Sequence, residues 1–150
     1  MTYCHIHTHS EYSALDGLST CTEIAQRAAD DGNPAAAITD HGTCAGHPDH
    51  QRACDEAGIK AVFGMETYFQ PDRLERPESG DTEGQKRLRG GRHLVLLAQD
   101  QAGLKNLWAL STEAYLTGHY HRPRCDWPLL EQYGQGLIMT TACLGGIVSS

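Results

Sequence analysis

Short apolar runs alternate with amphipathic segments along most of this chain. The apolar runs, bounded by Gly, Pro and Asp, predict strands at 3–9, 35–40, 59–68, 93–98 and 136–142. The segments between them carry apolar stripes at helical spacing and predict helices after a capping box at 20–23, at 47–57, from 101 to about 116, and near 127–133. Because strand and helix alternate without a hairpin signal, the pattern is typical of an α/β fold with parallel strands.

One stretch interrupts the alternation. Residues 71–91 are polar, charged and glycine-rich, and they predict a long exposed loop. Arg87, Arg89 and Arg92, in and beside this stretch, could contact a phosphate, although the pattern favours a solvated loop.

Three histidines occupy alternate positions in the first predicted strand. Since strand side chains alternate between faces, His5, His7 and His9 should point the same way. Packing gives no reason to line up imidazoles, whereas a metal ion does, because neutral imidazole is a good ligand for zinc and similar ions. Asp16, in an Asp-Gly turn, could return a carboxylate to the same place.

Polar groups also follow the other predicted strands. Asp40 and His41, Glu66 and Cys143 come near strand ends, where (β/α) barrels collect their active-site residues. A complete barrel needs about 250 residues. We therefore expect this chain of 150 residues to be part of a larger protein. No glycine motif of a dinucleotide fold or P-loop follows a predicted strand, which argues against those classes.

Composition narrows the function classes. The formal net charge of −7 argues against general nucleic-acid binding by this segment, although bound cations would offset several carboxylates locally. The six cysteines show no CxxC pair and no tight framework spacing, so in a reducing compartment we expect most of them to be small buried residues. The absence of a signal segment and of a bilayer-length apolar run predicts a cytoplasmic chain with no membrane partner.

Two motifs are distinctive: His-x-His-Ser-x-x-Ser at 7–13, followed by Leu-Asp-Gly at 15–17, and Ile-Thr-Asp-His-Gly at 38–42. They resemble the polymerase-and-histidinol-phosphatase (PHP) family. The closer resemblance is to the N-terminal PHP domains of bacterial DNA polymerase III alpha subunits. Further stretches that carry this closer resemblance lie at 58–68, 92–98, 103–107, 131–138 and 141–146.

The resemblance implies a distorted, TIM-like (β/α)7 barrel, of which residues 1–150 would form the N-terminal part. It also implies a centre of two or three divalent ions, zinc or manganese. The matching ligand positions are His7, His9, Asp16, His41, Glu66, His93 and Cys143. The family's later Asp-x-His motif does not occur after Cys143, so we expect the rest of the barrel and of the site to follow residue 150.

The chemistry of the expected ligands suits hydrolysis of a phosphodiester. Glu66 could bridge two cations, and a Cys143 thiolate would favour zinc over magnesium. Asp40 could orient a ligand. His93 starts its strand instead of ending it, so only the resemblance selects it. His5 has a structural role in this interpretation, and we assign no role to the remaining histidines, which we expect at the surface or at helix ends: His47, His50, His119 and His121.

For the intact protein, the resemblance implies a magnesium-dependent DNA-directed DNA polymerase acting in DNA replication. Its PHP domain would add 3′-5′ exonuclease activity, and its partners would be DNA, mainly through domains after residue 150, and other replisome subunits. Two alternatives stay open. The chain could be a stand-alone phosphoesterase similar to histidinol phosphatase, or a structural module whose metals only stabilise the fold and which binds replisome subunits.

Overall fold

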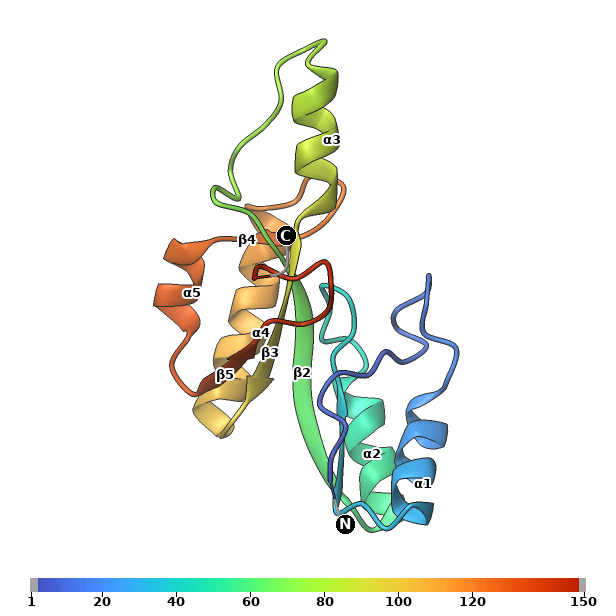
Figure 1. Cartoon of the computed structure of the whole chain (residues 1–150). Coiled ribbons are helices and arrows are strands. Elements are labelled where there is room, and N and C mark those ends of the chain that lie inside the picture. Colours follow the sequence, from blue (N-terminus) through green and yellow to red (C-terminus); the bar gives the residue numbers. More distant parts are fainter. Residues whose placement is uncertain (1–2, 149–150) are drawn as a thin grey trace.

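The long strand β2 (Lys60–Phe69) organises the fold, which a computed structural model describes for residues 3–148 (Figure 1). Its first half pairs in parallel with β1 (Ala35–Ile38), and its second half pairs antiparallel with β3 (Arg92–Ala98). The two-residue strand β4 (Arg124–Cys125) also pairs with β2, and β5 (Leu137–Thr140) lies beyond β3. Within the described residues, the sheet has five strands in the order β1-β2-β3-β5, with β4 on β2.

Helices cover the two halves of β2 separately (Figure 1). Helices α1 (Cys21–Asp30) and α2 (His47–Ala57) pack on β1 and on the first half of β2. Helix α4 (Gln101–Leu116) packs on β3, beside the second half of β2, and α5 (Trp127–Tyr133) packs on α4. Two buried clusters result, one centred on Ile38 and Cys54, the other on Leu96 and Leu107.

Most predicted elements are confirmed within one to three residues, as is the α/β class. The predicted capping box is present, since Thr20 Oγ1 accepts from Glu23 N and the Glu23 carboxylate accepts from Thr20 N. None of the helices within residues 3–148 has the length and apolar content needed to cross a membrane.

The prediction of a first strand at 3–9 is wrong, because this segment joins the sheet through too few bonds to form a ladder. Thr39 N donates to Thr8 O at 2.8 Å, and Thr8 N donates to the Thr39 hydroxyl at 3.0 Å. His5 is consequently not held on the face of His7 and His9. Its Nε2 lies 2.7 Å from the Tyr3 hydroxyl and is exposed.

The prediction that 71–91 is an exposed loop is also wrong. It contains helix α3 (Thr82–Gly90), whose N-terminus is capped by Asp81 accepting from Gly84 N. Leu88 is fully buried and anchors this otherwise polar helix to the rest of the molecule. The charged residues and glycines of this segment favoured a loop. Helix α3 has one apolar residue, Leu88, and one residue cannot produce a periodic apolar pattern.

The prediction of parallel strands fails at β3. The segment with α3 projects from the end of β2 and returns to that same end instead of crossing back over the sheet (Figure 1). The chain therefore reverses direction, and β3 runs antiparallel to both β2 and β5. The start of β3 consequently lies beside the end of β2, with His93 opposite Tyr68.

His47 and His50, expected at the surface or at helix ends, are buried in the structure. Each imidazole Nε2 lies at hydrogen-bonding distance from a backbone carbonyl, Gly64 O at 3.0 Å for His47 and Ala36 O at 2.9 Å for His50. The Trp108 indole donates to His47 Nδ1, which fixes that ring as a neutral acceptor on one side. Burial lowers the pKa of both histidines from the usual 6.5.

We expect His50 to make the stability of the chain fall with acidity. Because its folded pKa is lowered, only the unfolded chain takes up this proton just below pH 6.5, and the free energy of unfolding falls as the pH drops. His50→Gln keeps a donor for Ala36 O and removes the titration. Urea unfolding between pH 7.5 and 5 should therefore show a shallower pH slope, by up to about 1.4 kcal/mol per pH unit.

His119→Gln is the matched control, because it removes an exposed histidine. Its slope should equal that of the unsubstituted chain. Equal slopes for His50→Gln and the unsubstituted chain would show that His50 is not buried as a neutral group.

Candidate metal centre

The buried carboxylate of Glu66 is the centre of the candidate site. Backbone bonds fix this residue of β2 on both edges, since Gly42 N donates to Glu66 O, Glu66 N donates to Asp40 O, and Val95 of β3 lies opposite. The Glu66 side chain is only 1% exposed. Because an unpaired buried carboxylate is costly, its surroundings must compensate the charge.

Four imidazoles surround Glu66. On one carboxylate oxygen, Oε2, His7 Nε2 lies at 2.6 Å, His9 Nε2 at 2.9 Å and His41 Nδ1 at 3.9 Å. On the other, Oε1, the partner is His93 Nδ1. The two oxygens therefore face different sets of histidines, an arrangement in which one carboxylate can serve two cations.

The electrostatics of the cluster favour an ionised carboxylate. Burial would raise the pKa of Glu66, but hydrogen bonds from His9 and His7 and the charge of His93 lower that pKa to about 2. The hydrogen bond to Glu66 in turn raises the pKa of His9. The carboxylate thus attracts positive charge, whether it comes as protons on the imidazoles or as a metal ion.

Asp16 joins the cluster from the turn that the sequence indicated. Its Oδ2 lies 2.9 Å from His41 Nε2 and its Oδ1 lies 3.9 Å from His9 Nδ1. The turn needs glycine next to Asp16, because a Cβ at Gly17 would lie 1.8 Å from Ser10 O. Asp16 is half exposed, so this side of the cluster is open to solvent.

Cys143 lies at the edge of the cluster. Its Sγ is 3.5 Å from His93 Nδ1, accepts from Gly145 N, and is exposed. The structure brings the other six expected ligands into three groups whose donor atoms lie within 4.8 Å of one another. These groups are His7 with His9 and Glu66, His9 with Asp16 and His41, and His41 with Glu66 and His93.

The hydroxyl of Ser13 sets the tautomer of His9. His41 N donates to this oxygen at 3.0 Å, and the single hydroxyl proton goes to Asp40 Oδ1 at 3.0 Å. His9 Nδ1, 3.1 Å away, must therefore donate its proton to Ser13. The buried Asp40 also accepts from Ser10 N and Oγ, so it holds the turn that orients His9.

These contacts fit a divalent cation. With one proton on Nδ1, His9 faces Glu66 Oε2 through Nε2, a contact that needs positive charge, either a second proton on the ring or a cation bound to Nε2. Within residues 3–148, His41 Nδ1 is buried without a hydrogen bond, and the buried Glu66 Oε1 has only the ion-pair contact with His93. Imidazole nitrogens, carboxylate oxygens and a nearby thiolate are the donors that zinc and similar ions take.

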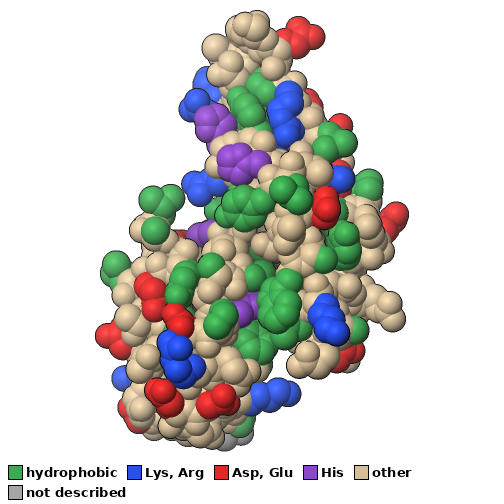
Figure 2. All heavy atoms as spheres, turned by 180° about the vertical axis from the view of Figure 1, so that it is seen from behind, with side chains coloured by type: hydrophobic (Ala, Val, Ile, Leu, Met, Phe, Trp, Pro, Cys, Tyr) green, Lys and Arg blue, Asp and Glu red, His purple; other side chains and the backbone are tan. Residues whose placement is uncertain are grey.

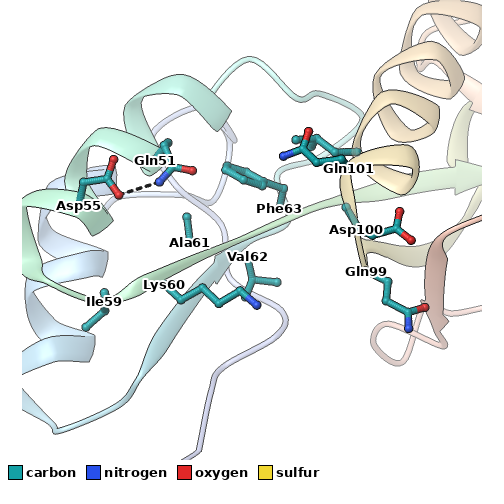
Figure 3. A pocket seen from close by; sticks show the side chains of 12 residues that line it. Gln51, Asp55, Ile59, Lys60, Ala61, Val62, Phe63, Gln99, Asp100 and Gln101 are labelled. Carbon is teal, nitrogen blue, oxygen red and sulfur yellow. Dashed lines mark hydrogen bonds between the residues drawn. The ribbon is translucent and has the colours of Figure 1, made fainter.

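A pocket of about 510 Å³ opens beside this cluster, and Asp16, His41 and His93 line it. A second pocket, of about 460 Å³, lies near the start of β2 between α2 and α4 (Figure 3). Its lining contains no His or Cys. Its two carboxylates already have partners, since Gln51 donates to Asp55 and Gly103 N donates to Asp100. Of these two pockets, the first combines space with candidate ligands.

Two residues that position the cluster were given no role by the sequence reasoning. Ser13 belongs to the first motif, but only the folded turn shows which groups its hydroxyl contacts. Tyr68 packs on His41 and His93, with ring centroids 5.8 and 5.5 Å away. The sequence carries no signal for Tyr68, because its role depends on the pairing of β2 with β3.

Comparison with known proteins supplies further evidence. A sequence model of the family described as PHP domain matches residues 5–150. Similar curated proteins include DNA polymerase III subunit alpha of Aquifex aeolicus, 40% identical over 145 residues, and that of Treponema pallidum, 41% identical over 147 residues. Each alignment covers 97% of this chain but 12% of the relative, so the chain spans about an eighth of these proteins' length.

Two solved structures have a similar fold. An amidohydrolase from Chromobacterium violaceum, solved with bound sulfate and no metal, matches 74% of this chain and 32% of its own length, with a TM-score of 0.51 and 27% identity. A protein described as a metal-dependent phosphoesterase, from Bifidobacterium adolescentis, matches 75% of this chain and 33% of its own length. Its TM-score is 0.51 at 21% identity, and this likeness concerns the fold alone.

We expect Ser13→Ala to weaken metal binding without removing a ligand. Loss of the hydroxyl frees His9 to change tautomer and leaves Asp40 with one fewer donor. Partners of this kind typically contribute about 10- to 100-fold in metal affinity. Titration calorimetry with Mn²⁺ or Zn²⁺ measures the affinity, and nitrogen chemical shifts of the metal-free protein report the His9 tautomer.

Ser19→Ala, at an exposed position near the same turn, is the control and should change neither quantity. Unchanged affinity and an unchanged tautomer in Ser13→Ala would refute the role of this hydroxyl.

Proposed function

The chain belongs to the PHP domain family, and on this premise we propose that it is a metal-dependent phosphoesterase module that hydrolyses phosphodiester bonds at the 3′ end of DNA. The observation that carries the proposal is the convergence of four histidines on the buried Glu66, with Asp16 beside two of them and a buried ring nitrogen of His41 left without a hydrogen bond. A cluster built only to stabilise the fold would not need unmatched donors.

We propose His7, His9, Asp16, His41, Glu66, His93 and Cys143 as the residues that hold two or three ions, zinc or manganese. When bound, such ions polarise a phosphoryl oxygen and make a coordinated water more acidic. Glu66 contributes its two oxygens to separate groups of histidines, consistent with a bridging role. The exposed Cys143 sulfur beside His93 favours zinc at that position.

The chain's own residues prepare the site for this chemistry. Asp40 and Ser13 hold His9 with its proton directed away from Glu66, so that Nε2 is free as a donor atom. Asp16 lies against His41 Nε2 on the open side, next to the pocket where a substrate has access. These contacts hold the metal-binding nitrogen and oxygen atoms in place in the free protein. Less conformational entropy is therefore lost when a cation binds.

For the intact protein we propose DNA-directed DNA polymerase activity in DNA replication, with magnesium serving a polymerase domain outside these 150 residues. The curated relatives at 40% and 41% identity support this part of the proposal, and they favour it over a stand-alone phosphoesterase similar to histidinol phosphatase. DNA and other replisome subunits would be the partners, and the cytoplasm the location. The PHP module would then trim 3′ ends in the 3′-5′ direction.

The double variant His7→Ala/His9→Ala tests the ligand assignment and the activity together. It removes two of the donor atoms nearest Glu66, so we expect it to lose bound zinc or manganese after dialysis. We also expect it to lose metal-dependent trimming of a single-stranded oligonucleotide. Elemental analysis measures the metal, and electrophoresis of a 5′-labelled strand measures the trimming.

His5→Ala is the matched control, since His5 belongs to the same histidine series but bonds to Tyr3. It should retain both metal and activity. Unchanged metal content in the double variant would refute the ligand assignment. Loss of metal and stability with unchanged trimming would instead favour a structural metal site.

A further inference from the structure

Two arginines line the pocket beside the candidate metal centre. Arg89 comes from the last turn of α3, and Arg122 from the loop before β4. A smaller adjoining pocket is lined by the same two arginines and His121. Segments more than thirty residues apart therefore place two guanidinium groups around one space, which Asp16, His41 and His93 also line.

These two arginines differ from most others in the chain because they lack an internal partner. Arg73 and Arg87 form ion pairs with Asp126 and Glu75, and the buried Arg124 donates to backbone carbonyls. Within residues 3–148, the guanidinium groups of Arg89 and Arg122 form no hydrogen bond or ion pair, and that of Arg122 lies over the Tyr68 ring. A guanidinium group presents five donors and suits phosphate oxygens, so two without partners at a pocket can bind an anion.

Contacts fix the position of Arg122 relative to the metal centre. Its guanidinium carbon lies 5.2 Å from the ring centroid of Tyr68. Tyr68 in turn packs on His41 and His93. The tyrosine is thus a spacer between the arginine and two candidate ligands, and an anion held by Arg122 would lie beside the cluster and not within it.

Charge is distributed unevenly around this pocket. The projecting lobe, defined as residues 70–92 and 117–126, contains eight of the twelve Lys and Arg residues but six of the nineteen Asp and Glu residues. It therefore carries a formal charge of +2, whereas the remainder carries −9. Figure 2 shows Lys, Arg and His side chains gathered on the upper part of one face. A polyanion would approach the centre from this lobe.

Part of the pocket wall is apolar. It is formed by Tyr12, Ala14 and Leu15, and Leu15 is 83% exposed. An exposed leucine next to two arginines matches a nucleotide, whose base has apolar faces and whose backbone carries phosphate. A small phosphate monoester would leave this wall without a contact.

We propose that Arg89 and Arg122 bind the backbone phosphate next to the bond that is cut, and so select the end of a single-stranded oligonucleotide over small phosphate esters. This inference rests on the proposed phosphodiesterase function and specifies its substrate. The two residues determine specificity: they contact the substrate chain, while the metal ligands contact the reacting phosphate.

The test uses the metal-loaded protein with two substrates, a 5′-fluorescent oligo(dT) and bis(p-nitrophenyl) phosphate. In Arg89→Ala and Arg122→Ala, we expect KM for the oligonucleotide to rise roughly tenfold, the loss typical of one hydrogen bond to a charged group. Each variant should also reduce the slope of log KM against log salt by about one. Metal content and turnover of the small diester should stay unchanged.

Arg92→Ala is the matched control, because the exposed Arg92 side chain has no hydrogen bond or ion pair in the described part of the chain, yet does not line the pocket. It should retain the KM of the unsubstituted protein. An unchanged KM in the double variant Arg89→Ala/Arg122→Ala would overturn the inference. So would an equal loss on both substrates, since the arginines would then act on the reacting phosphate.

Failure of the proposed function has a different signature. The unsubstituted protein would hold metal but hydrolyse neither substrate. Fluorescence anisotropy of the same oligonucleotide then decides the inference on its own: weaker binding by the double variant than by Arg92→Ala supports it, and equal binding overturns it.

Discussion

The structure depends on compensating one buried negative charge. Glu66 is fixed on both edges of β2, so its carboxylate cannot move to solvent, and burying it without partners would cost several kcal/mol. The compensation comes from His7, His9, His41 and His93, of which His7 and His9 lie on a segment outside the sheet ladder. The order of these segments is therefore linked to the positive charge at the centre, and a bound cation would supply that charge without requiring protons on the imidazoles.

The reversal of the chain after β2 completes the arrangement. Since β3 runs antiparallel to β2, its first residues lie at the edge where β2 ends, which is also where His41 lies. His93 therefore reaches Glu66 from the start of a strand, as no parallel strand would allow. The projecting segment that makes the reversal also carries α3 and Arg89 to the same end of the sheet. One topological change thus provides both a candidate ligand and a candidate substrate contact.

What the sequence predicted well was local. Caps, glycine stops and helical stripes placed α1, α2, α4 and α5 closely, because these signals act within a few residues. Three features depend on residues far away in the sequence, and no local pattern predicts them. They are the direction of β3, the burial of His47 and His50, and the failure of residues 3–9 to pair as a strand. The candidate site was found mainly because a motif groups residue types. The hydrogen bonds within the site, such as those of the Ser13 hydroxyl with Asp40, His9 and His41, could be identified only from the structure.

The net charge of the chain also says less than the positions of the charged residues in the fold. A net charge of −7 argues against coating of a duplex, and the distribution strengthens that argument, because the body of the molecule carries −9. The net charge of the body disfavours phosphate, and the excess of positive charge lies on the projecting lobe, which carries the two arginines of the pocket. Since such fields fade over roughly 10 Å at physiological salt, only the part of a strand that reaches the lobe is held. An acidic body with a small basic lobe beside the centre therefore suits a module that binds the ends of strands and not their length.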